Sequence, residues 1–471
     1  MKRLTLQNFL IFLILAFLIV SAFLIRLKNF KSNPVRSIDE IVYYRLGLQL
    51  TKDLSDYNII EYGRELAATG RSLPQYFFAA LFKHPPLFPL MIAGAMKIFG
   101  NQIISGEYIS LLFGVFMIPL VYFLGSVIVN KRVGLASAFF IYIDPVNIIC
   151  SQKVWMETTV AFFTVLAIFL FIYGVNQNKD SLFIYSGIAS GFAGLTKYPG
   201  ILATFVVALY CIIYKPEVFR NRKFLTGLVS PFLMLLPWVY WNYLVYGPKF
   251  LANQTSIHNF GLMGTRTQLV LLMWIFLAIG VIAGLRKPIR IVLFEKRPKG
   301  EDVSSLKLST IVYWGVFCTA LYKNIVHSLQ FEYLPTASWM QGLFYNETPF
   351  FYFGRLIEWS LLYLFAFASL FFDQRNHPKG KSVLTLGAFV LFIFYMIWQS
   401  YQSRYILAAI PFLVILAADF INKFFVRTQR MESFGPRLFS RGSLVIILCY
   451  IIMKTLYINN VLSYPNDMCY F

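Results

Sequence analysis

Apolar runs of about 15–22 residues recur along almost the whole chain, and no other feature of the sequence restricts the fold as strongly. A run of this length crosses the hydrocarbon core of a bilayer when it is helical. Spanning segments must satisfy their own backbone hydrogen bonds, and the strands of a barrel would alternate in polarity. Composition agrees, because 58% of the residues are hydrophobic and only 13% are charged. The sequence therefore predicts an all-α, polytopic membrane protein.

Thirteen of these runs are predicted to be transmembrane helices, and one shorter run is not. The predicted spans are residues 9–25, 104–129, 133–150, 158–174, 181–196, 199–213, 224–245, 268–285, 308–322, 355–372, 382–398, 405–421 and 443–459. Leu87–Phe99 is too short for a span and suits a helix that lies in the membrane interface. The first run follows Met1-Lys2-Arg3 as in a signal peptide. Ser21-Ala22 is a poor cleavage site, so a retained first helix is favoured.

Basic residues outnumber acidic residues by 42 to 21, and they gather in short loops between the apolar runs. This pattern is typical of positive-inside topology, and no basic amphipathic face or recognition motif indicates a nucleic-acid partner. If Leu87–Phe99 does not cross the membrane, more than half of the basic residues fall on the side of the N-terminus. We therefore expect an inner-membrane or plasma-membrane protein with a cytoplasmic N-terminus. Residues 26–103 then form the first extracytoplasmic loop.

Cysteines and linkers add few further constraints. The five cysteines show no CxxC spacing and are typical of small buried residues rather than of a metal site or a disulfide framework. No residue pattern requires a cofactor, although a divalent metal ion is compatible with the sequence. No Pro/Ser-rich linker or low-complexity tract interrupts the chain. Residues 1–471 are therefore predicted to form one transmembrane domain without a separate soluble domain.

The first loop holds polar residues that are unlike the sequence around it. It contains Ser37-Ile38-Asp39-Glu40 near its start and Lys83-His84-Pro85-Pro86 further on. Residues 41–48 predict an amphipathic helix, and a carboxylate at its start fits either an N-cap or a general base for an acceptor hydroxyl. The two prolines predict the beginning of the helix over Leu87–Phe99. A helix N-terminus flanked by lysine and histidine suits a phosphate group.

Polar residues from other predicted helices fall on the same side of the membrane as this loop. They are Lys153, Glu157, Lys197, His258, Arg266, Lys323 and Arg404. Charge at the membrane edge is costly and is often functional, but long basic side chains at helix ends also snorkel to the interface. For Lys153, Arg266 or Lys323 taken singly, snorkelling is favoured. For Asp39, Glu157 and Arg404, a functional role is favoured.

The order of these features resembles that of the GT-C membrane glycosyltransferases, in particular the protein O-mannosyltransferases and the lipid A aminoarabinose transferase. The likeness covers roughly residues 1–200 and 399–415. It rests on an N-terminal helix, Asp39-Glu40, the HPPL segment at 84–87, Phe99-Gly100, Trp155-Met156-Glu157, the LxK segment Leu195-Thr196-Lys197, and Ser403-Arg404-Tyr405-Ile406-Leu407 with Pro411. Where the aminoarabinose transferase has an acid–Lys pair before its prolines, this chain has Lys83-His84.

The resemblance implies a transferase that moves a sugar from a polyprenyl-phosphate donor to a glycan, lipid or protein acceptor, with inversion, at the extracytoplasmic face. Its partners would be that donor, membrane lipids and the acceptor. Fixed cations would stabilise the departing phosphate. The implied catalytic residues are Asp39 and Glu40; those that bind the donor phosphate are Lys83, His84, Lys197, Arg404 and Tyr405; those that contact sugar or acceptor are Glu157, His258 and Arg266.

Two other functions stay open at this point. A transporter or flippase of lipid-linked sugars would need charged residues near the bilayer midplane and paired discontinuous helices. In this chain the charge gathers at one face, which favours the transferase. An oligosaccharide ligase or polymerase would use the same class of donor, and only its product would distinguish it.

Overall fold

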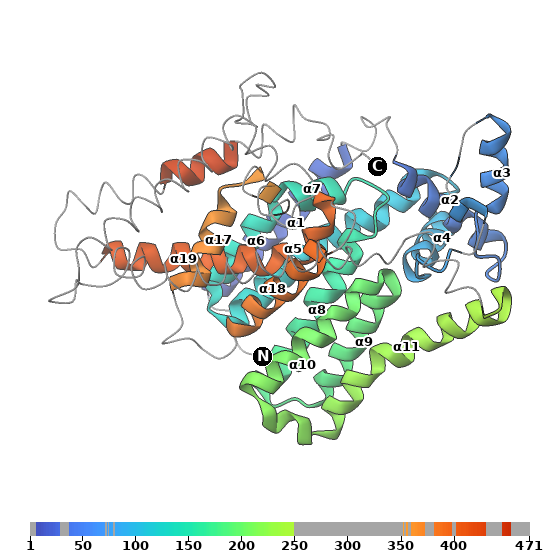
Figure 1. The fold of residues 1–471 in the computed structure, drawn as a ribbon. Helices are drawn as coiled ribbons and strands as arrows, with labels where there is room; N and C mark the ends of the chain where they lie inside the picture. The colour runs from blue at the N-terminus through green and yellow to red at the C-terminus, as the bar shows by residue number, and fades with distance from the viewer. Residues whose placement is uncertain are drawn as a thin grey trace, which may run out of the picture. The chain divides into compact units, whose positions relative to one another are not determined.

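The structure, a computed structural model, describes residues 6–28, 37–70, 73, 75–78, 81–248, 352, 355–356, 359–372, 381–397, 402–429 and 445–453. All regular structure in these ranges is helical, as the sequence predicts (Figure 1). The α-helices are α1 Leu6–Lys28, α2 Ile38–Lys52, α3 Ile60–Ala68, α4 Leu87–Phe99, α5 Ile103–Ile128, α6 Lys131–Tyr142, α7 Pro145–Cys150, α8 Glu157–Gln177, α9 Ser181–Thr196, α10 Leu202–Tyr214, α11 Arg222–Tyr246, α17 Leu362–Phe372, α18 Lys381–Ile397 and α19 Ile410–Gln429. Short 3₁₀ helices are η2 Gln75–Phe78, η3 Tyr198–Ile201, η4 Pro216–Arg220 and η5 Ser403–Ala408.

Four helices in the described part of the chain are long and apolar enough to cross a membrane, namely α1, α5, α8 and α11. Shorter apolar helices include α4, α9, α10 and α18. Together they define an integral, multi-pass membrane protein, whereas the number of spans stays a prediction. The predicted spans 268–285 and 308–322 lie outside the described residues.

Helix limits agree with the sequence pattern where caps and prolines mark them. Helix α9 covers the predicted 181–196, and α4 covers the predicted 87–99. Some predicted spans are not single helices. Residues 405–421 are divided between η5 and α19, and residues 133–150 are divided because α6 ends at Tyr142 and α7 begins at Pro145. Proline has no N–H to donate and disfavours the helical conformation of the residue before it, here Asp144.

The chain divides into two compact units. The first contains the described residues up to Val127 and those from Val146 to 248. Within it, α8, α9, α10 and α11 lie side by side, and α2 packs on α4 (Figure 1). The second unit contains Ile128–Pro145 and the described residues from 352 onward, and in it α6, α17 and α18 contact α19. The single domain expected from the sequence stays a prediction.

Glycines allow α9 and α11 to approach closely. Gly187 and Gly191 are four residues apart on α9, a small-residue spacing that permits close helix packing in membranes. A Cβ atom at Gly187 would lie 2.0 Å from the carbonyl oxygen of Gly227, and one at Gly191 would lie 2.3 Å from Sδ of Met234. The two backbones therefore meet at Gly187, where no larger side chain fits, and at Gly191 the side chain of Met234 takes the space.

The first polar loop is folded around an apolar core of its own. Helix α2 crosses α4 at Gly47, where a Cβ atom would lie 2.5 Å from Cγ2 of Ile92. Trp238 of α11 joins this core, which ties the loop to the end of a membrane helix. The buried core residues are Val42, Leu46, Leu50, Tyr57, Ile59, Phe77, Leu81, Phe82, Ala93 and Trp238. The polar residues near 39 and 83 are thus held on a packed scaffold.

Candidate active site

Helix α2 begins with a capping box that the sequence displays as Ser-x-x-Glu. Ser37 is the N-cap, and its Oγ accepts a hydrogen bond from the backbone N–H of Glu40. In return, the backbone N–H of Ser37 donates to Oε2 of Glu40 at 2.9 Å. Each side chain satisfies a backbone group that the first turn of a helix leaves without an intrahelical partner. The cap is therefore Ser37, and the alternative that a carboxylate caps this helix is wrong.

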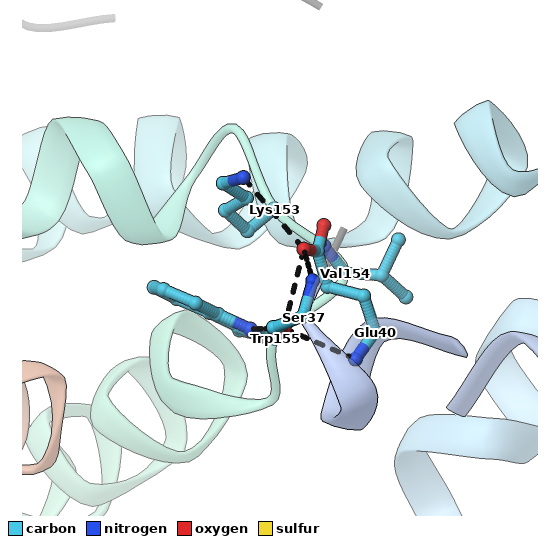
Figure 2. A network of polar contacts seen from close by, with 5 residues as sticks. All are labelled: Ser37, Glu40, Lys153, Val154 and Trp155. Carbon is cyan, nitrogen blue, oxygen red and sulfur yellow. Dashed lines mark hydrogen bonds and ion pairs between the residues drawn. The ribbon is translucent and has the colours of Figure 1, made fainter. Parts of the chain in front are cut away.

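Glu40 also joins α2 to the segment that leads into α8 (Figure 2). Its Oε2 lies 3.7 Å from Nζ of Lys153, and its Oε1 accepts a hydrogen bond from the backbone N–H of Val154 at 3.3 Å. Trp155 donates from Nε1 to Oγ of Ser37 at 3.0 Å. Glu40 and Lys153 are both fully buried. The snorkelling interpretation of Lys153 is therefore wrong, because its amino group faces an internal carboxylate.

Asp39 differs from its neighbour in being partly exposed. Tyr43 is four residues further along α2, so both side chains lie on one face of the helix. The ring of Tyr43 packs edge-on against the imidazole of His84, with 5.1 Å between ring centroids. This contact directs the Asp39 face of α2 toward the turn that carries Lys83 and His84.

Lys83 is partly buried beside this face, and its pKa shows two opposing influences. Burial, the larger one, lowers the pKa of the Lys83 amine from 10.5 to about 8, while the negative charge of Asp39 raises it. Burial disfavours the charged form of an amine, and a nearby carboxylate favours it. The cation is thus balanced between its charged and neutral forms near physiological pH, next to a carboxylate.

A second ion pair joins two of the predicted site residues. Glu157 is the first residue of α8, and Lys197 is the C-cap of α9. Nζ of Lys197 donates to Oε1 of Glu157 at 3.1 Å, with the Glu157 side chain 4% exposed and the Lys197 side chain 20% exposed. The sequence predicts both at the same membrane face, which stays a prediction, and the ion pair brings their charged groups together.

Arg404 and Tyr405 belong to the second unit. Both lie in η5, where Arg404 is buried and donates from Nε to Oε1 of Gln402 at 2.7 Å. Its Cζ is 5.4 Å from the centre of the Tyr405 ring, and that ring stacks on Tyr395. A guanidinium at this distance over an aromatic face is attracted by the ring.

Two predicted site residues, His258 and Arg266, lie outside the described residues, as does Lys323. Within the ranges that the structure describes, no group of three or more His, Cys, Asp or Glu side chains could hold a metal ion. Cys150 and Cys211 are buried as predicted, whereas Cys449 is exposed and does not follow that prediction.

Comparison with known structures identifies the class of the fold. ArnT from Cupriavidus metallidurans, in a crystal structure with undecaprenyl phosphate, matches 92% of this chain with a TM-score of 0.55 and 15% identity. The oligosaccharyltransferase of Archaeoglobus fulgidus, tethered to an acceptor peptide with an NVT sequon, matches 96% with a TM-score of 0.57 and 17% identity. The chain spans 63% of that ArnT and 55% of that oligosaccharyltransferase. It therefore has the fold of the GT-C membrane glycosyltransferases.

Sequence comparison matches about a third of the chain to a known family. Residues 83–241 match the family described as dolichyl-phosphate-mannose-protein mannosyltransferase, so the resemblance found in the sequence is confirmed. A curated relative from Aquifex aeolicus (strain VF5), described as an uncharacterized protein, is 26% identical over 215 residues, which is 45% of this chain and 43% of the relative. The matched family segment contains Lys83, His84, Glu157 and Lys197.

Proposed function

We propose that this protein is a GT-C glycosyltransferase that moves a sugar from a polyprenyl-phosphate donor to an acceptor hydroxyl, with inversion, at the extracytoplasmic membrane face. The observation that carries the proposal is the position of Asp39. It is a partly exposed carboxylate on the face of α2 that packs against the Lys83–His84 turn, and it acts electrostatically on the Lys83 amine. A base next to a cation suits a reaction in which a hydroxyl loses a proton while a phosphate departs.

The proposed step assigns one role to each of these charges. The carboxylate of Asp39 accepts the proton of the acceptor hydroxyl as its oxygen attacks the anomeric carbon. The bond from that carbon to the phosphate oxygen breaks, and the polyprenyl phosphate leaves with the bonding electrons. Lys83, His84 and Lys197 stabilise the negative charge of the departing phosphate. Arg404 and Tyr405 are predicted to act on the same phosphate, and Glu157 to contact sugar or acceptor.

Glu40 receives a different role in this proposal. The resemblance implies that it is a second catalytic residue, and no observation tests that role directly. Its carboxylate is fully buried and engaged by Ser37, Val154 and Lys153. These contacts favour a positioning role, in which Glu40 holds the start of α2 so that Asp39 keeps its orientation.

The molecules bound by proteins of the same fold support the class of substrate. One ArnT structure contains undecaprenyl phosphate, and a structure of AglB from Archaeoglobus fulgidus contains a dolichol phosphate and an inhibitory peptide. We extend only the shared chemistry, a polyprenyl phosphate, to this chain. The matched family suggests mannose as a first sugar to test and a protein hydroxyl as a first acceptor.

The experiment is a transfer assay with the purified full-length chain in proteoliposomes. Synthetic polyprenyl-phosphate sugars are supplied with candidate acceptors, and products are identified by mass spectrometry. Wild-type protein should form product, whereas Asp39→Asn and Arg404→Ala should each lose at least about 100-fold in rate, as expected for removal of a general base or of an oxyanion-stabilising group. If both variants keep the wild-type rate, these assignments are refuted. Movement of lipid-linked sugar across the vesicle membrane without any transfer would favour the flippase instead.

A further inference from the structure

The turn that carries Lys83 and His84 makes its backbone hydrogen bonds outside any helix or strand. Residues 81–86 form no helix or strand, and Pro85 and Pro86 have no N–H groups with which to build one. Within the turn, the N–H of His84 donates to the carbonyl oxygen of Leu81 at 3.0 Å. Buried carbonyl groups without hydrogen bonds are costly. The carbonyls of Phe82, His84 and Pro85 therefore need donors from elsewhere in the fold.

Two tyrosines from distant parts of the chain supply these donors. The hydroxyl of Tyr57 donates to the carbonyl oxygen of His84 at 2.8 Å and lies 3.3 Å from that of Pro85. The hydroxyl of Tyr198 donates to the carbonyl oxygen of Phe82 at 2.5 Å. Both bonds hold the main chain of the turn and do not involve the side chains of Lys83 and His84.

Each tyrosine is in turn held by aromatic residues of α11. Trp238 donates from Nε1 to the hydroxyl of Tyr198 at 3.0 Å, and its ring packs on Tyr57 at 4.8 Å between centroids. Tyr246 donates to the backbone carbonyl of Tyr57 at 3.0 Å. Tyr57 is fully buried, and this burial raises the pKa of its hydroxyl well above 10, so it stays a neutral donor.

The sequence position of Tyr198 links this arrangement to the second ion pair. Tyr198 directly follows Lys197, whose amine pairs with Glu157. A bond from Tyr198 to Phe82 therefore fixes the backbone next to Lys197 against the backbone next to Lys83. The two lysines come from segments more than a hundred residues apart, and this bond sets the spacing between their main chains.

We propose that Tyr57 and Tyr198 are positioning residues of the active site, whose hydroxyls hold the 82–85 turn so that Lys83 stays beside Asp39 and at a fixed spacing from Lys197. This inference rests on the proposed function, because it takes those lysines as the cations that meet the donor phosphate. In this role the tyrosines act through the backbone of the turn and not by contact with the reacting atoms.

The test uses Tyr198→Phe, Tyr57→Phe and the double variant in the full-length chain. Each single substitution keeps the ring and removes one hydroxyl. Tyr44→Phe is the matched control, because its hydroxyl also donates to a backbone carbonyl, that of Asn101, but away from the turn. The first readout is the pH dependence of Lys83 acylation by acetic anhydride, measured by mass spectrometry, which needs no activity.

In wild type and in Tyr44→Phe, the Lys83 acylation profile should have its midpoint near pH 8. In Tyr198→Phe and Tyr57→Phe it should shift upward by at least half a pH unit, because a loosened turn exposes the amine to water. The second readout is transfer, in which KM for the polyprenyl-phosphate donor should rise about tenfold in each single variant, the equivalent of one buried hydrogen bond.

The outcomes separate the two claims. If wild type transfers sugar and the Tyr198→Phe variant changes neither the acylation midpoint nor KM, the positioning role is refuted. If acylation shifts as expected but wild type transfers no sugar, the tyrosines hold the turn as inferred and the proposed function fails. Should Tyr57→Phe not fold, Tyr198→Phe still decides, because its hydroxyl is only partly buried.

Discussion

Asp39 and Glu40, the two adjacent acids of α2, should respond differently to neutralisation. Asp39→Asn should remove activity, whereas Glu40→Gln should lower stability. Glu40 is fully buried against the fully buried Lys153, so Glu40→Gln leaves an ammonium group without its counter-charge in the protein interior. Removing one partner of a buried pair typically costs about 3–5 kcal/mol. Solvent does not screen the interaction between Glu40 and Lys153, since neither group reaches water.

The structure also predicts an asymmetry between the two partners. The carboxylate of Glu40 accepts hydrogen bonds from the backbone N–H groups of Ser37 and Val154, so it keeps donors when the lysine is removed. Lys153→Met should therefore cost less than Glu40→Gln, about 1–3 kcal/mol. The double variant should cost about 1–3 kcal/mol less than the sum of the two, because it leaves no unpaired buried charge.

The assay is thermal unfolding of the purified protein in detergent, followed by intrinsic fluorescence. Glu40→Gln should lower Tm by roughly 5–15 °C. Asp39→Asn is the matched control, since it makes the same chemical change one residue earlier at a partly exposed position, and its cost should stay within about 0.5 kcal/mol.

Transfer activity should not follow stability when equal amounts of folded protein are compared. Asp39→Asn, which costs little stability, should lose the reaction, and Lys153→Met, which costs more, should retain most of it. Equal Tm values for Glu40→Gln and wild type would refute the buried pair as described. Strict additivity of the Glu40→Gln and Lys153→Met costs would refute the coupling between them.

Three further predictions follow from the geometry of single residues. The amine of Lys83 must be protonated to attract a phosphate, and its pKa is lowered to about 8 by burial, so kcat/KM should fall as pH rises through about 8. Lys83→Arg should keep activity above that pH, and an unchanged profile would exclude Lys83 as the titrating group. Gly187→Ala should reduce the yield of folded protein, because its methyl group would meet the Gly227 carbonyl at 2.0 Å; wild-type Tm and yield would contradict the close contact of α9 and α11. Arg404→Lys should recover only part of the rate lost in Arg404→Ala, because an ammonium lacks the planar face that lies over Tyr405, and full recovery would argue for charge alone.

Local sequence patterns predicted the limits of the helices well where prolines or charged residues mark the helix ends. The limits of α4 and α9 agree with the sequence because a di-proline precedes one and the apolar run of the other stops at charged residues. The break between α6 and α7 also had a visible signal in Asp144-Pro145, although the apolar run around it suggested one span. Periodicity alone did not reveal it.

The pairing of site residues was harder to predict because it depends on tertiary contacts. The Ser-x-x-Glu pattern at 37–40 could have assigned Glu40 to a capping box, and this signal was missed. The partnership of Glu40 with Lys153 joins segments more than a hundred residues apart, and no local pattern encodes it. Tyr57 and Tyr198 were also missed, since a tyrosine in an aromatic-rich chain carries no sign of the carbonyl it will meet.

The tyrosine contacts to the 82–85 turn have a consequence for protein engineering. Because these bonds are made to peptide groups, they do not depend on which side chain stands at position 83, whereas the buried imidazole of His84 also packs on Tyr43. Position 83 is therefore one at which charge, length or pKa can be altered while the tyrosine contacts to the turn remain. A library confined to this position would explore donor preference with little loss of folded protein.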